Sequence, residues 1–277
     1  MTATATRPST ALPSLLTVSR SRVRVELLSF FRERQAVVFV LFFPIILLVV
    51  FGAVFGGNNE IAPGVQFIQY FVAGMIAAGL LSASFQNLAI EIPIERDNGY
   101  LKRLAGTPMP KAAYFIGKVV LVGVIAVIQT TLLLVIGVLL YGVTLPTGLQ
   151  TWLDFAWIAV LGITACTLLG IAFSSLPKNG KSAPAIVSPI AIVLQFISGV
   201  FFVFSQLPNW MQTVAAIFPL KWMTQGMRSV FLPDVAQAAE PAGSWELGRI
   251  ALVLGVWCVV GLALCLLTFR WRTRTDG

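Results

Sequence analysis

The sequence contains no histidine among its 277 residues, and only 11% of its residues are charged. Without histidine, the chain has no imidazole to act as a general base or a metal ligand. The three cysteines, Cys166, Cys258 and Cys265, lie inside apolar runs, which favours small buried side chains over a disulfide framework. We therefore expect no catalytic residue, no metal site and no cofactor bound by this chain.

Apolar residues, in contrast, make up 57% of the chain, and the mean hydropathy is +0.88. Soluble domains carry roughly a quarter charged residues, so the composition predicts a membrane protein. The net charge of +8 raises the question of nucleic acid, but the 19 Lys and Arg are scattered at the ends of apolar runs. That distribution is typical of spans oriented in a lipid bilayer, and we expect no nucleic-acid partner.

Six apolar runs are long enough to cross roughly 30 Å of hydrocarbon as helices. We expect an all-α membrane protein with one transmembrane unit over 36–269, preceded by residues 1–35 and followed by a basic tail, 270–277. The six predicted spans lie at about 36–56, 67–90, 112–141, 153–176, 183–204 and 249–269.

Charge distribution predicts the orientation of these spans. With both termini inside, every Lys and Arg except Lys221, Arg228 and Arg249 falls on the cytoplasmic side. This is the bias that the positive-inside rule requires. The chain is therefore predicted to be N-in and C-in, in the cell (plasma or bacterial inner) membrane.

Residues 1–35 contain a pattern typical of an amphipathic helix at the membrane surface. Leu15, Leu16, Val23, Leu27 and Phe30 recur at helical spacing, while basic side chains fall elsewhere. The long apolar run that follows does not fit the short core of a cleavable signal peptide. We expect a cytoplasmic tail leading into an interfacial helix.

Between the last two predicted spans lie two amphipathic, aromatic segments, NWMQTVAAIF and KWMTQGMRSVF. Each is too short to cross the bilayer, so we expect two short, half-buried helices on the outer side. The alternative is one additional span. Lys221 and Arg228 in its middle argue against that alternative.

A polar segment at 91–118 separates the second and third predicted spans. Asp97 or Asn98 can cap a short helix there, with Leu101 and Leu104 on its apolar face and Gly106 at its end. An ordinary charged loop that obeys the positive-inside rule explains the same residues, and the spacing alone leaves both open.

The fourth span carries small residues at four-residue intervals, which predicts a seam for close helix packing. The seam consists of Gly162, Cys166, Gly170 and Ser174.

No Asp, Glu or His lies well inside a predicted span, which argues against ion-coupled transport and intramembrane catalysis. SLPKNGKS imitates the end of a phosphate-binding loop, but Ser175 stands where that motif needs glycine, and the segment follows a membrane helix rather than a strand. We therefore expect the chain not to be an enzyme, and any ATP hydrolysis to occur on a separate subunit.

The whole pattern resembles the drug- and lipid-exporting (daunorubicin-resistance-like) branch of the type-2 ABC exporter permeases. Between spans 2 and 3, that family has a Glu-x-x-x-Gly-x-Leu pattern followed by a basic residue, Leu, Thr-Pro and Gly-Lys. A Pro-Leu pair followed by an Arg in the outer segment matches Pro219, Leu220 and Arg228. The matching residues of the polar segment are Glu95, Gly99, Leu101, Arg103, Leu104, Thr107, Pro108, Gly117 and Lys118.

The resemblance implies a dimer, with a second copy or a paralogue, bound to two ABC ATP-binding subunits that hold ATP and Mg²⁺. The polar segment would be the coupling helix in a groove of the ATPase, braced by the N-terminal helix. The implied coupling residues are Glu95, Arg96, Gly99, Leu101, Arg103, Leu104, Thr107, Pro108 and Lys111. Candidate residues of the substrate path are Phe71, Met75, Gln86, Asn87, Gln195 and Phe196, although helix or lipid packing explains each aromatic or Met singly.

These expectations converge on the permease subunit of an ATP-driven exporter of an amphipathic drug, lipid or similar compound. Two alternatives remain: a polysaccharide-exporting permease of the same architecture, and a non-transporting scaffold that recruits a soluble partner.

Overall fold

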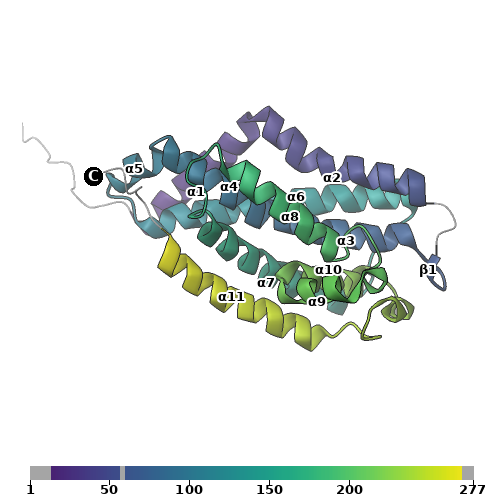
Figure 1. The fold of residues 1–277 in the computed structure, drawn as a ribbon. Coiled ribbons are helices and arrows are strands. Elements are labelled where there is room, and N and C mark those ends of the chain that lie inside the picture. Colours follow the sequence, from purple (N-terminus) through teal and green to yellow (C-terminus); the bar gives the residue numbers. More distant parts are fainter. Residues whose placement is uncertain (1–13, 57–59, 270–277) are drawn as a thin grey trace, which may run out of the picture.

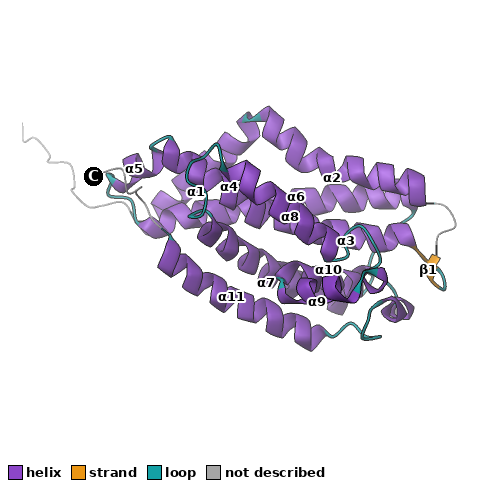
Figure 2. Ribbon diagram, in the orientation of Figure 1, coloured by secondary structure: helices purple, strands orange, loops and turns teal. Residues whose placement is uncertain are grey.

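The computed structural model describes residues 14–56 and 60–269; the predicted tail residues 1–13 and 270–277 lie outside the described residues. The described part is a bundle of helices running along one long axis, with one short antiparallel hairpin (Figures 1 and 2). Its elements are α1 (Leu15–Arg32), α2 (Arg34–Phe55), β1 (Glu60–Ala62), β2 (Val65–Gln66), α3 (Phe67–Leu81), η1 (Ser82–Gln86), α4 (Asn87–Asp97), α5 (Tyr100–Ala105), α6 (Lys111–Tyr141), α7 (Leu149–Phe173), α8 (Ala183–Ile197), η2 (Phe204–Gln206), α9 (Asn209–Ile217), α10 (Pro219–Phe231), η3 (Asp234–Ala239) and α11 (Leu247–Thr268).

Five of the described helical segments are long and apolar enough to cross a membrane, which agrees with a multi-span fold. They are Val37–Phe55, Phe67–Asp97, Lys111–Tyr141, Leu149–Phe173 and Leu247–Thr268. The predicted span at 183–204 contains a shorter apolar helix, α8, which stops at Ile197 because the chain turns at Gly199 in the left-handed region (φ 74°). The six-span topology therefore stays a prediction.

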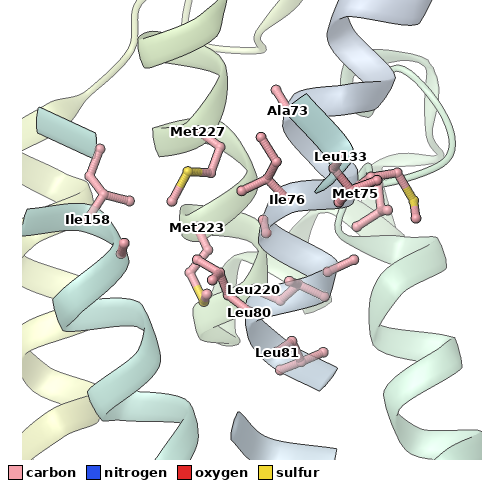
Figure 3. Packing of buried hydrophobic residues seen from close by; sticks show 14 of the residues in the cluster. Ala73, Met75, Ile76, Leu80, Leu81, Leu133, Ile158, Leu220, Met223 and Met227 are labelled. Atoms are coloured by element: carbon pink, nitrogen blue, oxygen red, sulfur yellow. The ribbon is translucent and has the colours of Figure 1, made fainter. Parts of the chain in front are cut away.

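The centre of the bundle is the continuous helix formed by α3, the π-helical turn η1 and α4. Most of this segment is buried, whereas α2 and α11, which lie at the two edges, are mostly exposed (Figure 1). Figure 3 shows α3 residues packed between Leu133 of α6 and the methionines Met223 and Met227 of α10. Small residues of α3 allow close neighbours: Gly79 lies against Gln129 of α6, and Gly74 lies against the backbone of Val200.

The helix of α3, η1 and α4 also extends beyond Ile90, the predicted end of the second span, as far as Asp97. Its last turns stay in the bundle because Ile92 and Pro93 are buried. The two acidic residues there, Glu91 and Glu95, both pair with Lys118, so the helix can continue with its charges neutralised.

The expectation of two half-buried outer helices is wrong for α10, which is almost completely buried. It packs against α3, α7 and α11, and its polar side chains find partners inside the protein. Thr224 donates to the Ser198 carbonyl at 2.9 Å, and Arg228 pairs with Glu240 at 2.8 Å. These internal partners remove the need for a water-facing side, whereas α9 stays mostly exposed.

The N-terminal helix α1 forms as predicted, but its polar side faces the protein. Ser19, Arg22 and Glu26 are buried against α6, Leu27 and Phe30 of the apolar pattern are partly buried, and Leu16 near the start of the helix is 78% exposed. The approach to α6 is close: a Cβ on Gly117 would lie 2.7 Å from Cγ of Arg22. The buried polar side chains of α1 need partners within the bundle.

The segments predicted to be cytoplasmic meet at one end of the bundle. Figure 1 shows α1 and α5 there, and the turn between α7 and α8 joins them because the Gly180 amide donates to Asp97 at 2.6 Å. The hairpin, α9 and α10 lie at the opposite end (Figure 1).

Candidate functional site

Lys118 of α6 occupies the centre of a cluster of charged side chains at this end. It is fully buried, and its Nζ lies 3.0 Å from Glu26 Oε2, 2.8 Å from Glu91 Oε1 and 2.9 Å from Glu95 Oε1. The spacing of four residues puts Glu91 and Glu95 on one side of α4, while Glu26 comes from α1. One ammonium therefore links three helices; the Lys118 cluster is hereafter Arg22, Glu26, Glu91, Glu95 and Lys118.

Arg22 is the second cation of the Lys118 cluster. It pairs with Glu26, lies 3.8 Å from Glu95 and donates to the hydroxyl of Tyr100. Burial by itself would lower the pKa of Arg22, but Glu26 and then Tyr100 more than offset it, so the pKa is raised. Arg22 therefore carries its charge beside the carboxylates of the cluster.

The three carboxylates of the cluster lie close enough together, with oxygens within 4.8 Å of one another, to suggest a metal site. The Lys118 ammonium, however, lies within 3.0 Å of an oxygen of each of them. The ammonium neutralises the carboxylates as a metal ion would, and it has three N–H donors to offer them. The arrangement thus fits an internal ion-pair network rather than a metal centre.

The short helix α5 begins directly beside the Lys118 cluster. Gly99 turns the chain from α4 into α5 with a backbone in the left-handed region (φ 68°). This conformation is strained for a β-branched residue. Tyr100 then binds Arg22, and Leu101 is completely buried with Tyr114, whose hydroxyl donates to Glu95 at 2.6 Å. The start of α5 is therefore fixed to α1, α4 and α6.

The other predicted coupling residues lie mostly on the outside of α5 and the turn that follows it. Arg103, Thr107, Pro108 and Lys111 are exposed, and Leu104 is partly buried. Thr107 does not begin the next helix: its hydroxyl donates back to the Leu104 carbonyl at 2.7 Å, and α6 starts only at Lys111. These exposed residues form a basic surface at the end of the bundle.

The expected helix cap at Asp97 or Asn98 is wrong, because Gly99 occupies the N-cap position of α5 and no side chain caps the helix. Asp97 instead binds the amide of Gly180, and Arg96 donates to the Ser174 carbonyl at 3.2 Å. Tertiary contacts with the turn between α7 and α8 replace the local cap. That turn connects two helices, so no strand precedes it to build a phosphate-binding loop.

Beside the Lys118 cluster lies a cavity of about 660 Å³ bounded by α1, α2, α4 and α5. Of the predicted substrate-path residues, Asn87 lines it, together with residues of the cluster and apolar side chains such as Phe30, Val40 and Ile90. Two buried atoms at this cavity, Arg22 Nε and Glu91 Oε2, have no hydrogen-bond partner among the described residues.

The remaining path residues are not gathered around one cavity. Phe71 and Met75 are buried in the core, whereas Phe196 on α8 is 47% exposed. Phe201 contacts both rings, with centroid distances of 6.3 Å to Phe71 and 4.8 Å to Phe196. Gln86 donates to Ser188 of α8 at 3.4 Å, and Gln195 on the same helix is partly buried.

The small-residue seam of α7 faces two neighbours. A Cβ on Gly162 would meet the side chain of Met223 at 2.8 Å, and Cys166 Sγ lies 3.6 Å from the sulfur of the same methionine. Gly170 lies against the backbone of Phe85 in η1, and Ser174 is buried at the end of the helix.

Sequence reasoning missed Arg22, Glu26 and Glu91 as partners of Lys118. The available signal was the pair of four-residue spacings, Arg22–Glu26 and Glu91–Glu95, each of which puts two charges on one helix face. It also missed Glu240 as the buried partner of Arg228.

Comparison with known proteins places this arrangement among membrane transport proteins. The model of the family described as ABC-2 type transporter matches residues 20–232, which include the whole Lys118 cluster. The probable multidrug ABC transporter permease YbhR of Escherichia coli (strain K12) is 24% identical over 198 residues, 72% of this chain and 53% of YbhR. The match therefore spans about half the length of that relative.

Two further relatives match over larger shares of their own length. The inner membrane transport permease YadH of Escherichia coli (strain K12) is 22% identical over 190 residues, 66% of this chain and 70% of YadH. The putative transport permease ycf38 of Porphyra purpurea is 23% identical over 226 residues, 79% of this chain and 77% of the relative.

Proposed function

The chain belongs to the ABC-2 type transporter family of multi-pass membrane proteins, and from this premise we propose that it is the permease subunit of an ATP-driven exporter. ATP and Mg²⁺ bind a separate ABC ATP-binding subunit, which docks on the exposed surface of α5 and the following turn. The cargo is an amphipathic compound such as a drug or lipid. The name of YbhR, a probable multidrug permease, supports this cargo class.

The observation that carries the proposal is the attachment of α5 to the core of the bundle through the Lys118 cluster. Tyr100 and Leu101 fix the start of α5, and Lys118 joins α1 and α6 to α4. Because α4 is continuous with the buried α3, a displacement of α5 moves the central helix of the bundle. ATP binding and hydrolysis on the partner can then shift the permease between two global states.

The edges of the bundle leave room for a second permease subunit. Most of the surface of the apolar helices α2 and α11 is not covered by the rest of the bundle. Those surfaces contact lipid or a second copy or paralogue in the dimer that we propose. The orientation with both termini in the cytoplasm puts α5 on the side where ATP is available.

The test is substrate-stimulated ATPase activity of the permease purified with its ABC ATP-binding subunit. We expect Glu95→Ala and Gly99→Val to abolish the stimulation while both variants still insert in the membrane and elute as folded protein. Glu95→Ala removes the contacts with Lys118 and Tyr114, and Gly99→Val strains the turn into α5.

Two positions provide matched controls. Glu33→Ala removes an exposed acid at the end of α1, and Gly123→Val adds a side chain in open space on α6. Unchanged stimulation in both test variants would overturn the coupling role, and an active transporter with no nucleotide hydrolase would overturn the permease proposal. A scaffold would bind its partner without any cargo-dependent ATPase activity.

A further inference from the structure

A second cavity, of about 450 Å³, lies at the end of the bundle opposite the Lys118 cluster. It is formed where α2 ends, the β1–β2 hairpin begins, α3 starts and the chain leaves α8. Its lining residues are Phe55, Glu60, Ile61, Phe67, Phe201, Phe202, Val203 and Gln206, hereafter the outer cavity. We propose that the outer cavity binds amphipathic organic cations, and this assignment of a cargo class rests on the function proposed above.

The charge of the outer cavity is of one sign. Glu60 is the only charged residue among the described residues that line it, and none of them is basic. Gln206 adds a neutral polar group. A carboxylate beside an otherwise apolar surface attracts a cation and repels an anion.

Aromatic rings form most of the remaining wall. Four phenylalanines line the outer cavity, and two of them, Phe55 and Phe202, are 38% and 46% exposed. A ring face carries partial negative charge and attracts a cation within about 6 Å of its centroid. Several ring faces together with one carboxylate are the combination that recognises bulky organic ammonium and phosphonium ions.

The aromatic wall continues into the bundle. Ring centroids are 5.4 Å apart for Phe55 and Phe67, 6.1 Å for Phe67 and Phe71, and 4.7 Å for Phe71 and Phe51. Phe71 is a residue that the sequence placed on the substrate path, and it is completely buried. The outer cavity is thus the open end of a series of rings that leads to the central helix.

The size of the outer cavity also fits this ligand class. Its volume of about 450 Å³ lies within the roughly 300–1,000 Å³ that is usual for small-molecule sites. A neutral apolar compound would use the rings but not the carboxylate. The effect of removing the charge of Glu60 therefore separates an organic cation from a neutral cargo.

The experiment compares tetraphenylphosphonium with tetraphenylborate, two aromatic ions of nearly equal size and opposite charge. Equilibrium binding of each to the full chain in lipid nanodiscs is measured, with binding to empty nanodiscs subtracted. We expect saturable binding of tetraphenylphosphonium and none of tetraphenylborate. Glu60→Gln and Phe202→Leu should each weaken the phosphonium affinity by about three- to tenfold.

Matched controls lie at the other end of the bundle. Glu33→Gln neutralises an exposed acid, and Phe31→Leu replaces a phenylalanine that is 45% exposed. Both should bind tetraphenylphosphonium as the wild type does. Equal binding of the two ions, no saturable binding of either, or no effect of Glu60→Gln and Phe202→Leu would each overturn the cation site.

This binding measurement needs neither nucleotide nor the ATPase subunit, so its outcome is independent of the coupling test. If coupling is shown but tetraphenylphosphonium does not bind, the permease function stands and the cation site fails. If tetraphenylphosphonium binds but Glu95→Ala and Gly99→Val leave the ATPase activity unchanged, the coupling role fails and the cation site stands.

Discussion

The Nζ of Lys118 lies 2.8 Å from Glu91 Oε1, and this pair joins α6 to α4 at the point where the central helix leaves the core. The lysine is completely buried, and Glu91 is one of three carboxylates that face it. A buried ammonium is tolerated only when its charge and its donors are satisfied. The Lys118–Glu91 contact is therefore part of a network. Removal of Lys118 would take a partner from all three carboxylates at once.

Replacement of Lys118 by methionine should destabilise the permease strongly. The substitution keeps most of the side-chain volume but leaves three carboxylates close together, and breaking a buried pair destabilises by about 3–5 kcal/mol. We expect a lower Tm for Lys118→Met in a detergent thermal-shift assay. Lys178→Met, at an exposed lysine of the turn after α7, is the control and should be neutral; equal Tm values for the two variants would contradict the network.

Removal of the same lysine should also create a site for a divalent cation. Oxygens of Glu26, Glu91 and Glu95 lie within 4.8 Å of one another, and hard cations such as Ca²⁺ bind carboxylate oxygens. In Lys118→Ala the space left by the side chain can admit the ion and water. We expect millimolar Ca²⁺ to raise the Tm of Lys118→Ala more than that of the wild type, and a chelator to reverse the increase. An identical response of both proteins would contradict the interpretation that the Lys118 ammonium takes the place of a metal ion among the three carboxylates.

A second buried pair, Arg228 and Glu240, should hold the segment after α8 in place. Both side chains are 1% exposed; Arg228 also donates to the Gly199 carbonyl and lies 3.7 Å from the ring centroid of Tyr70. Arg228→Met should destabilise by about 3–5 kcal/mol, because it leaves a buried carboxylate unpaired. The double variant with Glu240→Gln should be more stable than the single one.

Arg249 and Glu246 provide the comparison for this cycle, since they form a salt bridge of 2.9 Å in which Arg249 is 63% exposed. Exposed pairs contribute about 0–1 kcal/mol, so Arg249→Met should change the Tm little. Double-mutant cycles should give a larger coupling free energy for the buried pair than for the exposed pair. A coupling free energy that is no larger would contradict the structural role of the Arg228–Glu240 pair.

The helices and their order could be predicted largely from hydropathy, because a chain in lipid must satisfy its backbone within helices. The Lys118 cluster could not, because Glu26 and Lys118 lie far apart in the sequence and only tertiary packing brings them together. The same reason explains Asp97, where a contact with Gly180 prevailed over a local cap. In α10 the amphipathic pattern predicted a water-facing side, but the polar residues are satisfied inside the bundle.

Lys221 on α10 should make the stability depend on pH. It is 6% exposed, and burial lowers its pKa to about 8; Glu240 and Glu246 oppose this shift, while Arg228 and Arg249 add to it. Below pH 8 the lysine is protonated in both the folded and the unfolded state. Between about pH 8 and the ordinary value of 10.5 only the unfolded state keeps the proton, so the folded state gains stability as the pH rises.

Lys221→Met isolates this contribution. The Tm of the wild type minus that of Lys221→Met should increase from pH 7.5 to pH 10, because the titrations of all other groups cancel in the difference. A difference that stays constant or falls over this range would show that the ammonium is not destabilised by its burial.

Gly170 of the α7 seam should be intolerant of any side chain. A Cβ there would lie 2.7 Å from the carbonyl oxygen of Phe85 and 3.0 Å from its Cα, and backbone atoms of the central helix cannot move aside as a side-chain end can. Gly255 on α11 has open space at the same position. Alanine has the higher helix propensity by about 1 kcal/mol, so Gly255→Ala should be neutral or stabilising and Gly170→Ala should lower the Tm. Both substitutions add the same methyl group to an apolar helix, so the sign of the difference between their Tm values tests the packing of α7 against η1 directly. Equal Tm values would show that the seam is not a close helix contact.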